Sequence, residues 1–106
     1  MAKGIDVSTW QGAIDWPKVK ASGRVDFAII RAGYGKNNVD DQAVANAAGC
    51  RKNNIPFGVY WFSYAYNEEM AKNEADYACD FAEKFGATLP IAYDWEEDSE
   101  NYARKN

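Results

Sequence analysis

The fold is predicted most directly by residues 89–98, which read Leu89-Pro90-Ile91-Ala92-Tyr93-Asp94-Trp95-Glu96-Glu97-Asp98. The apolar run after the proline predicts a buried strand that ends in a cluster of acids. Side chains alternate along a strand, so Asp94 and Glu96 point the same way, whereas Glu97 and Asp98 open a following helix. Two neighbouring carboxylates repel each other and lose hydration, which favours the protonated form of one of them. Asp94 and Glu96 are therefore a candidate acid–base pair, and the alternative is a solvated loop and helix start.

The size and composition of the chain indicate one small globular domain. It has 106 residues, of which 47% are hydrophobic and 26% charged, whereas a complete α/β barrel typically has about 250 residues. A net charge of -4 gives no electrostatic footprint for nucleic acid. No apolar run reaches the ~20 residues of a membrane span, and Met1-Ala2-Lys3-Gly4 lacks the apolar core of a signal peptide. We therefore expect neither nucleic acid nor a membrane as a partner.

The chain has no histidine, which excludes Ser-His-Asp triads and histidine metal sites. Its two cysteines, Cys50 and Cys79, lie far apart in helical patterns and form no CxxC motif. We expect both to be small buried hydrophobes, and we expect no metal or cofactor.

Strand and helix patterns alternate along the whole chain. Strands are predicted at residues 3–8, 27–30, 57–62 and 89–94, and the run at 27–30 is apolar enough to be buried on both faces. Helices are predicted at residues 16–22, 40–53, 67–85 and from 98 onward, with Asp15 and Asn67 as N-caps and Gly86 as a C-terminal stop. This order predicts an α/β fold with a parallel sheet and right-handed crossovers.

The residues best suited to chemistry follow the strands. Ligands of parallel α/β folds bind at the carboxyl edge of the sheet, where these residues would gather. For any single aromatic residue, core packing is the alternative. The residues concerned are Asp6, Trp10, Arg31, Tyr34, Tyr60, Trp61, Tyr64, Asp94 and Glu96.

These motifs together resemble glycoside hydrolase family 25, the Chalaropsis-type lysozymes or muramidases of bacteria, fungi and phages. The resemblance is carried by Gly4-Ile5-Asp6-Val7-Ser8 with Trp10-Gln11, Arg31-Ala32-Gly33-Tyr34-Gly35, Gly58-Val59-Tyr60-Trp61-Phe62-Ser63 and Asp94-Trp95-Glu96. It spans Lys3 to Glu97, and the motifs occur in the order expected.

The resemblance implies hydrolysis of the β-1,4 bond between N-acetylmuramic acid and N-acetylglucosamine in peptidoglycan, without metal or cofactor. It assigns Glu96 as the general acid and Asp94 as a nucleophile or as a residue that orients the substrate's N-acetyl group. Asp6 would be a third carboxylate that helps to hold the Glu96 proton. The aromatic residues expected to line the sugar groove are Tyr60, Tyr34, Tyr64, Trp61 and Trp10. An enzyme of this kind acts on cell walls, either after secretion or after release by a phage.

The length of the chain departs from the family pattern. The family has an irregular eight-stranded barrel about twice this long, so residues 1–106 would form a single domain equal to its first four strands. We expect a fragment of a longer barrel, a homo-dimer or higher oligomer that closes the structure, or an open α/β sandwich. Two other functions stay open: a non-catalytic carbohydrate-binding or self-assembling module, and a flavodoxin-like domain, which the lack of a Gly-rich phosphate loop disfavours.

Overall fold

The computed structural model describes residues 3–94 and 97–105, which form a five-stranded sheet with helices packed against it. The strands are β1 (Gly4–Val7), β2 (Phe27–Tyr34), β3 (Asn38–Val39), β4 (Phe57–Phe62) and β5 (Ala92–Asp94). The helices are the 3-10 turn η1 (Thr9–Gln11), α1 (Trp16–Ser22), α2 (Ala43–Lys52), α3 (Glu68–Phe85) and α4 (Glu97–Lys105).

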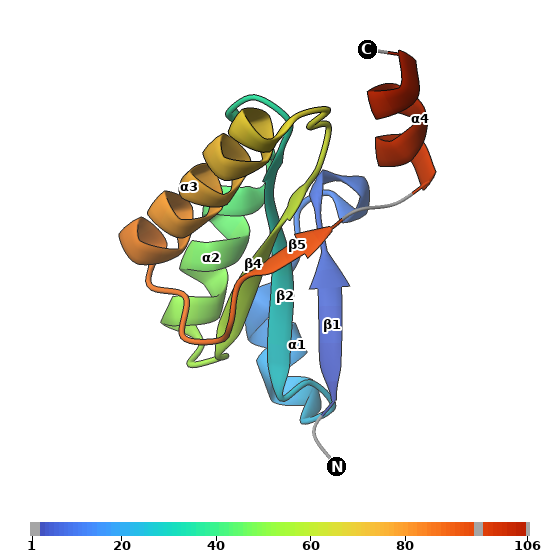
Figure 1. Ribbon diagram of the computed structural model, residues 1–106. Coiled ribbons are helices and arrows are strands. Elements are labelled where there is room, and N and C mark those ends of the chain that lie inside the picture. The colour runs from blue at the N-terminus through green and yellow to red at the C-terminus, as the bar shows by residue number, and fades with distance from the viewer. Residues whose placement is uncertain (1–2, 95–96, 106) are drawn as a thin grey trace.

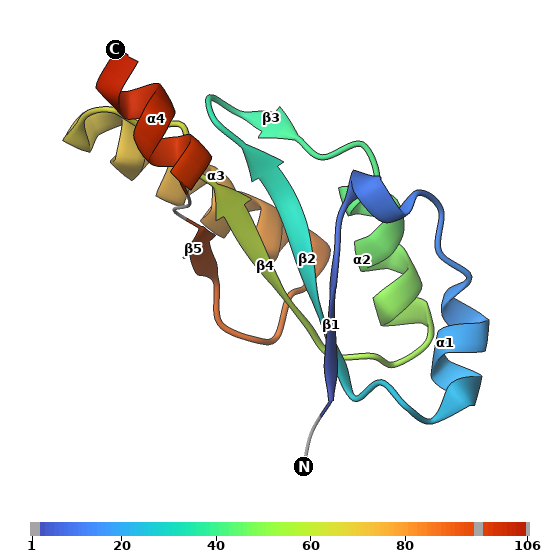
Figure 2. The same ribbon diagram turned by 90° about the vertical axis from the view of Figure 1, so that its right-hand side faces the viewer.

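The main sheet has the order β1-β2-β4-β5, and each of these neighbouring pairs is parallel. The predicted alternation of strands and helices is therefore confirmed, with all four carboxyl ends at one edge (Figure 1). The short strand β3, which the sequence did not reveal, turns back antiparallel along the end of β2 (Figure 2).

Helix ends follow the predicted local chemistry. The Asp15 side chain accepts a hydrogen bond from the Lys18 backbone N–H at 3.2 Å, and Asn67 accepts one from Met70 at 2.9 Å. Gly86 ends α3 with a φ of 80°, a left-handed conformation that glycine adopts without a Cβ penalty. Side-chain acceptors thus satisfy N–H groups at the starts of α1 and α3 that the helices leave unpaired.

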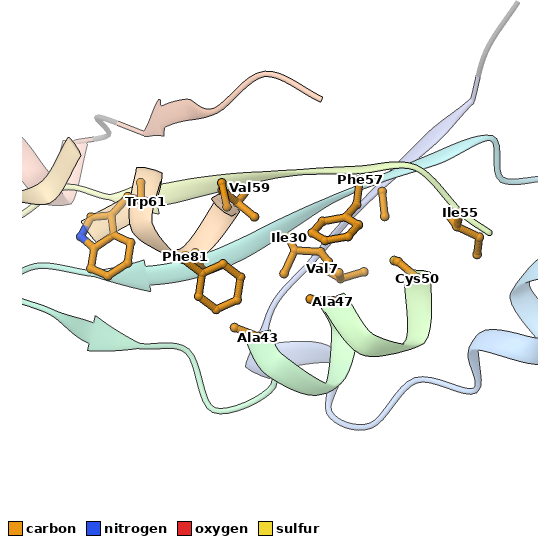
Figure 3. Close-up of a cluster of buried hydrophobic side chains, with 14 of the residues drawn as sticks. Val7, Ile30, Ala43, Ala47, Cys50, Ile55, Phe57, Val59, Trp61 and Phe81 are labelled. Atoms are coloured by element: carbon orange, nitrogen blue, oxygen red, sulfur yellow. The ribbon is translucent and has the colours of Figure 1, made fainter. Parts of the chain in front are cut away.

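One face of the sheet forms the hydrophobic core with the helices. Alternate residues of the strands point into it, and α2 and α3 close it from the other side (Figure 3). Figure 1 shows α4 apart from the layer that α2 and α3 form. The core residues on the strands are Val7, Ala28, Ile30, Ala32, Phe57, Val59 and Trp61, all 3% exposed or less.

In the part of the chain that the structure describes, no layer of helices covers the other face of the sheet, which we call the open face. Phe27 and Ile29 on β2 and Tyr60 and Phe62 on β4 are half-buried, and Asp6 on β1 is exposed. The prediction that residues 27–30 are buried on both faces is therefore wrong for this chain. Three helices cover a single face, because each connection between consecutive strands passes over the same side.

Candidate functional site

The predicted acids lie on the two outer strands of the parallel sheet. Asp6 is exposed on β1 and pairs in register with Ile29, which in turn pairs with Gly58. The backbone of Asp94 lies on β5 and pairs with Phe62. Two strands, β2 and β4, separate these acids, so the sheet does not place Asp6 beside Asp94.

Two of the other predicted site residues lie wholly or partly outside the described part of the chain. Glu96 lies outside the described residues, as does the side chain of Trp10. The backbone of Trp10 belongs to η1, directly after β1, where the sequence predicted a loop. Tyr60 is half-buried at the start of the carboxyl half of β4, in register with Arg31 on one side and Ala92 on the other.

Tyr34 and Tyr64 come together at the carboxyl edge of the sheet, as predicted for this edge. Their rings meet edge to face, with centroids 6.3 Å apart and planes at 73°. Phe62 extends the cluster, with its ring centroid 5.2 Å from that of Tyr64. The guanidinium carbon of Arg31 lies 5.3 Å from the centre of the Tyr34 ring, which is within the range of a cation–π contact.

A surface hollow of about 260 Å³ lies against this cluster, lined by Thr9, Arg31, Tyr34, Asp41 and Tyr64. Aromatic faces, a guanidinium, a hydroxyl and a carboxylate therefore surround one space. Such a mixture suits a polar ligand with apolar faces, because rings can cover the ligand while the polar groups hydrogen-bond to it.

A buried aspartate, Asp40, holds this edge together. It is 2% exposed, and its Oδ2 atom accepts hydrogen bonds from Arg31 Nε at 2.8 Å and from the Thr9 backbone N–H at 3.1 Å. Arg31 Nη2 lies 2.8 Å from the same oxygen, and Oδ1 accepts a hydrogen bond from the Gln42 backbone N–H at 2.9 Å. The sequence predicted Asp40 only as the opening of α2, which instead begins at Ala43.

A buried glutamate, Glu74, fixes the segment that follows β4. It is 2% exposed on α3 and accepts hydrogen bonds from the Ser63 hydroxyl at 2.8 Å and from the Tyr64 backbone N–H at 2.9 Å. Sequence reasoning missed this residue, although a signal was present. Glu74 falls on the stripe that Ala71 and Ala78 share, where a charge faces the core and needs partners.

The prediction that Trp61 lines the sugar groove is wrong. Its side chain is 1% exposed and points into the core toward α3, and its indole N–H donates to the Gly35 carbonyl at 2.9 Å (Figure 3). Trp61 follows Tyr60 on β4, and successive side chains point to opposite faces of a sheet. Trp61 therefore supports the strand from behind and cannot line a groove on the open face.

The cysteines differ from each other. Cys50 is fully buried on α2, and this burial raises the pKa of its thiol from 9.0 to about 12, whereas Cys79 is exposed on α3. The prediction is thus confirmed for Cys50 and wrong for Cys79. Within residues 3–94 and 97–105, no three Asp, Glu or Cys side chains cluster in a way that could hold a metal ion. The helices described there are too short or too polar to cross a membrane.

Comparison with known proteins places these features in a family. Lysozyme M1 of Streptomyces globisporus is 41% identical over 75 residues, which cover 71% of this chain and 25% of that protein. The autolysin LytC of Streptococcus pneumoniae, solved in complex with a synthetic peptidoglycan ligand, superposes with a TM-score of 0.79 at 35% identity over 88% of this chain and 22% of its own. A bacterial lysozyme from Streptomyces coelicolor gives a TM-score of 0.71 at 36% identity over 87% of this chain and 43% of its own.

The chain thus spans a quarter or less of Lysozyme M1 and of LytC. The family model named glycosyl hydrolases family 25 matches residues 5–106, which is nearly the whole chain and includes every motif at the carboxyl edge. The chain belongs to glycosyl hydrolase family 25.

Proposed function

We propose that the chain is the catalytic half of a peptidoglycan-hydrolysing glycosidase, a muramidase that cleaves between N-acetylmuramic acid and N-acetylglucosamine. The observation that carries the proposal is the hollow at the carboxyl edge, which Tyr34, Tyr64 and Arg31 line at the ends of β2 and β4. The strands on either side of this pair, β1 and β5, bear Asp6 and the start of the Asp94-Trp95-Glu96 motif. Peptidoglycan as substrate agrees with the family, and LytC was solved with a synthetic peptidoglycan ligand.

In this proposal Glu96 is the general acid that protonates the oxygen of the leaving sugar. Asp94 stabilises the positive charge at the anomeric carbon, either as nucleophile or by orienting the substrate's N-acetyl group. Asp6, exposed on the open face, is the third carboxylate and helps to hold the Glu96 proton. Tyr34, Tyr60, Tyr64 and Trp10 form the sugar-binding wall. No step requires a metal or a cofactor, and the enzyme acts on cell walls after secretion or release by a phage.

The proposed architecture is the first half of a (β/α) barrel. In residues 3–94 and 97–105, four parallel strands follow in chain order with α1, α2 and α3 on one face, and β1 and β5 are the outer strands with no described strand beyond them. In a barrel the open face is the interior, filled by side chains from all the strands. Further strands of a longer protein, or a second copy of this chain as a homo-dimer, would cover it.

Paired substitutions of adjacent glutamates test the catalytic assignment. In a form of the protein that completes the barrel, Glu96→Gln should lower the rate of reducing-end release from purified glycan strands by about 10²–10⁴, because glutamine cannot deliver a proton. Glu97→Gln is the matched control and should cost little. Equal losses in the two variants would refute the assignment of Glu96 as the acid.

A second candidate is a carbohydrate-binding or self-assembling module without catalytic activity. It is favoured by one observation: the described residues already form an aromatic hollow, whereas Asp6 and Asp94 lie on strands that β2 and β4 separate. Light scattering combined with the reducing-end assay on residues 1–106 separates the two readings. Glycan binding without hydrolysis, both by residues 1–106 and by a form of the protein that completes the barrel, supports the module, whereas turnover by a dimer or by the completed barrel supports the enzyme.

A further inference from the structure

Asp40 joins three separate segments at the edge where the sugar wall lies. Its carboxylate receives the backbone N–H of Thr9 from the segment after β1, the guanidinium of Arg31 from β2, and the backbone N–H of Gln42 at the start of α2. The Asp40 backbone N–H also donates to the Ala32 carbonyl at 2.9 Å. At 2% exposure the side chain is out of reach of a ligand in the hollow.

Arg31 transmits this anchoring to the aromatic wall. The Arg31 Nε and Nη2 atoms both lie 2.8 Å from Asp40 Oδ2, so two nitrogens of the guanidinium are held by one oxygen. The held guanidinium lies over the Tyr34 ring, and Tyr34 in turn meets Tyr64 edge to face. A continuous series of contacts therefore runs from the buried carboxylate to the rings that line the hollow.

Asp41, the residue next to Asp40, has a different environment. Asp41 is exposed and lines the hollow itself, whereas Asp40 lies behind it. The two consecutive aspartates therefore differ in position: Asp41 lines the hollow, whereas Asp40 binds the segments that form its walls.

We propose that Asp40 is a positioning residue for glycan binding, which acts through Arg31 to set the angle and spacing of Tyr34 and Tyr64. It also holds η1, and with it the backbone of Trp10, through the Thr9 N–H. The inference rests on the proposed function, because it takes the ligand of the hollow to be an N-acetylated glycan. The ligand does not contact Asp40, so removing the charge acts on affinity only through the geometry of the wall.

The test uses residues 1–106 and a soluble tetrasaccharide of alternating N-acetylglucosamine and N-acetylmuramic acid. Affinity is measured by NMR titration, at a temperature well below the thermal unfolding midpoint of each variant. Asp40→Asn should weaken binding by about tenfold, the equivalent of one lost aromatic contact. Arg31→Lys should weaken it to a similar degree, because lysine cannot hold both contacts to Oδ2. The double variant should be no weaker than either single one, because both changes break the same connection.

Asp15→Ala is the matched control for a merely structural role. It removes the N-cap of α1, a residue that does not line the hollow, and so should lower stability while leaving the affinity unchanged. Affinities of Asp40→Asn and Arg31→Lys that equal the wild type, or losses that add in the double variant, overturn the proposal.

A ring-to-ring nuclear Overhauser effect between Tyr34 and Tyr64 gives a second readout that needs no ligand. It should be lost in Asp40→Asn and in Arg31→Lys and kept in Asp15→Ala. If the wild-type chain binds no tetrasaccharide, the proposed glycan ligand is refuted, and this contact alone decides the positioning role. If the Tyr34–Tyr64 contact then persists in both Asp40→Asn and Arg31→Lys, the positioning role is overturned. Loss of the contact in these variants supports the role.

Discussion

Replacing Glu74 by alanine should destabilise the fold far more than any exposed acid on the same helix. The carboxylate is 2% exposed and accepts hydrogen bonds from the Ser63 hydroxyl and the Tyr64 backbone N–H. Ser63 is itself fully buried, so truncation removes a hydrogen-bond partner from a hydroxyl that lies away from solvent. The same change frees the segment that carries the Tyr64 ring.

The magnitude follows from the two hydrogen bonds. A hydrogen bond to a charged group contributes about 1.5–3 kcal/mol, so losing both costs about 3–6 kcal/mol of unfolding free energy. A small domain has about 5–15 kcal/mol in all, so the variant would be close to the limit of stability. Glu74→Gln should cost less, because the amide oxygen still accepts from Tyr64 and the Ser63 hydroxyl can turn to accept from the amide nitrogen.

Urea unfolding followed by circular dichroism measures these differences at constant protein concentration. Glu83→Ala is the control, since Glu83 is exposed on the same helix and should change the free energy by no more than about 0.5 kcal/mol. The expected order of stability is wild type and Glu83→Ala, then Glu74→Gln, then Glu74→Ala. A Glu74→Ala variant within about 1 kcal/mol of Glu83→Ala would refute the reasoning, because its hydrogen bonds would then contribute less than the smallest value assumed.

Two further predictions concern α2 and the thiols. Gly49→Ala gains about 1 kcal/mol of helix propensity but places a Cβ inside the Trp16 indole, so urea unfolding should show a net loss; a more stable variant would contradict this packing. Iodoacetamide at pH 8 should alkylate exposed Cys79 in the folded chain and should reach buried Cys50, whose pKa is about 12, only after urea unfolds it. Mass spectrometry measures the two alkylation rates, and equal rates in the folded chain would disprove this prediction. Because the Cys50 pKa is raised from 9.0, its contribution to stability is intact below pH 9 and declines as the pH rises toward 12.

Local signals made most of the fold predictable. The caps Asp15, Asn67 and Gly86 are visible in sequence because each acts on residues a few positions away, and all three were confirmed. The strand over residues 57–62 was also correct, since a continuous apolar run bounded by a proline leaves little choice. Strand and helix order then determined the parallel pairing.

The parts that could not be predicted depend on partners distant in sequence. Asp40 and Asp41 are adjacent acids with the same local pattern, and only the arrival of Arg31 and Thr9 on one side makes Asp40 a buried anchor. The direction of Trp61 was open because a strand end rich in rings offers aromatic side chains to both faces. The strand β3 has two residues and pairs with β2 only through the turn between them, so it leaves no pattern to detect.

The register of the sheet links the fold to the proposed chemistry. Asp6 lies in the row of Gly58 on β4, whereas Asp94 lies in the row of Phe62, four residues further along that strand. In a flat sheet the three strand spacings alone would hold the two residues about 14 Å apart, beyond the ~5–9.5 Å that separates the carboxyl pair of a glycosidase. A barrel of eight strands with a shear of eight staggers the register by about one residue per strand, so three steps across the sheet offset by four residues bring both positions to nearly the same level. The offset that would separate these acids in a flat sheet would therefore favour their approach in a curved one, which supports the proposal that catalysis requires a closed barrel.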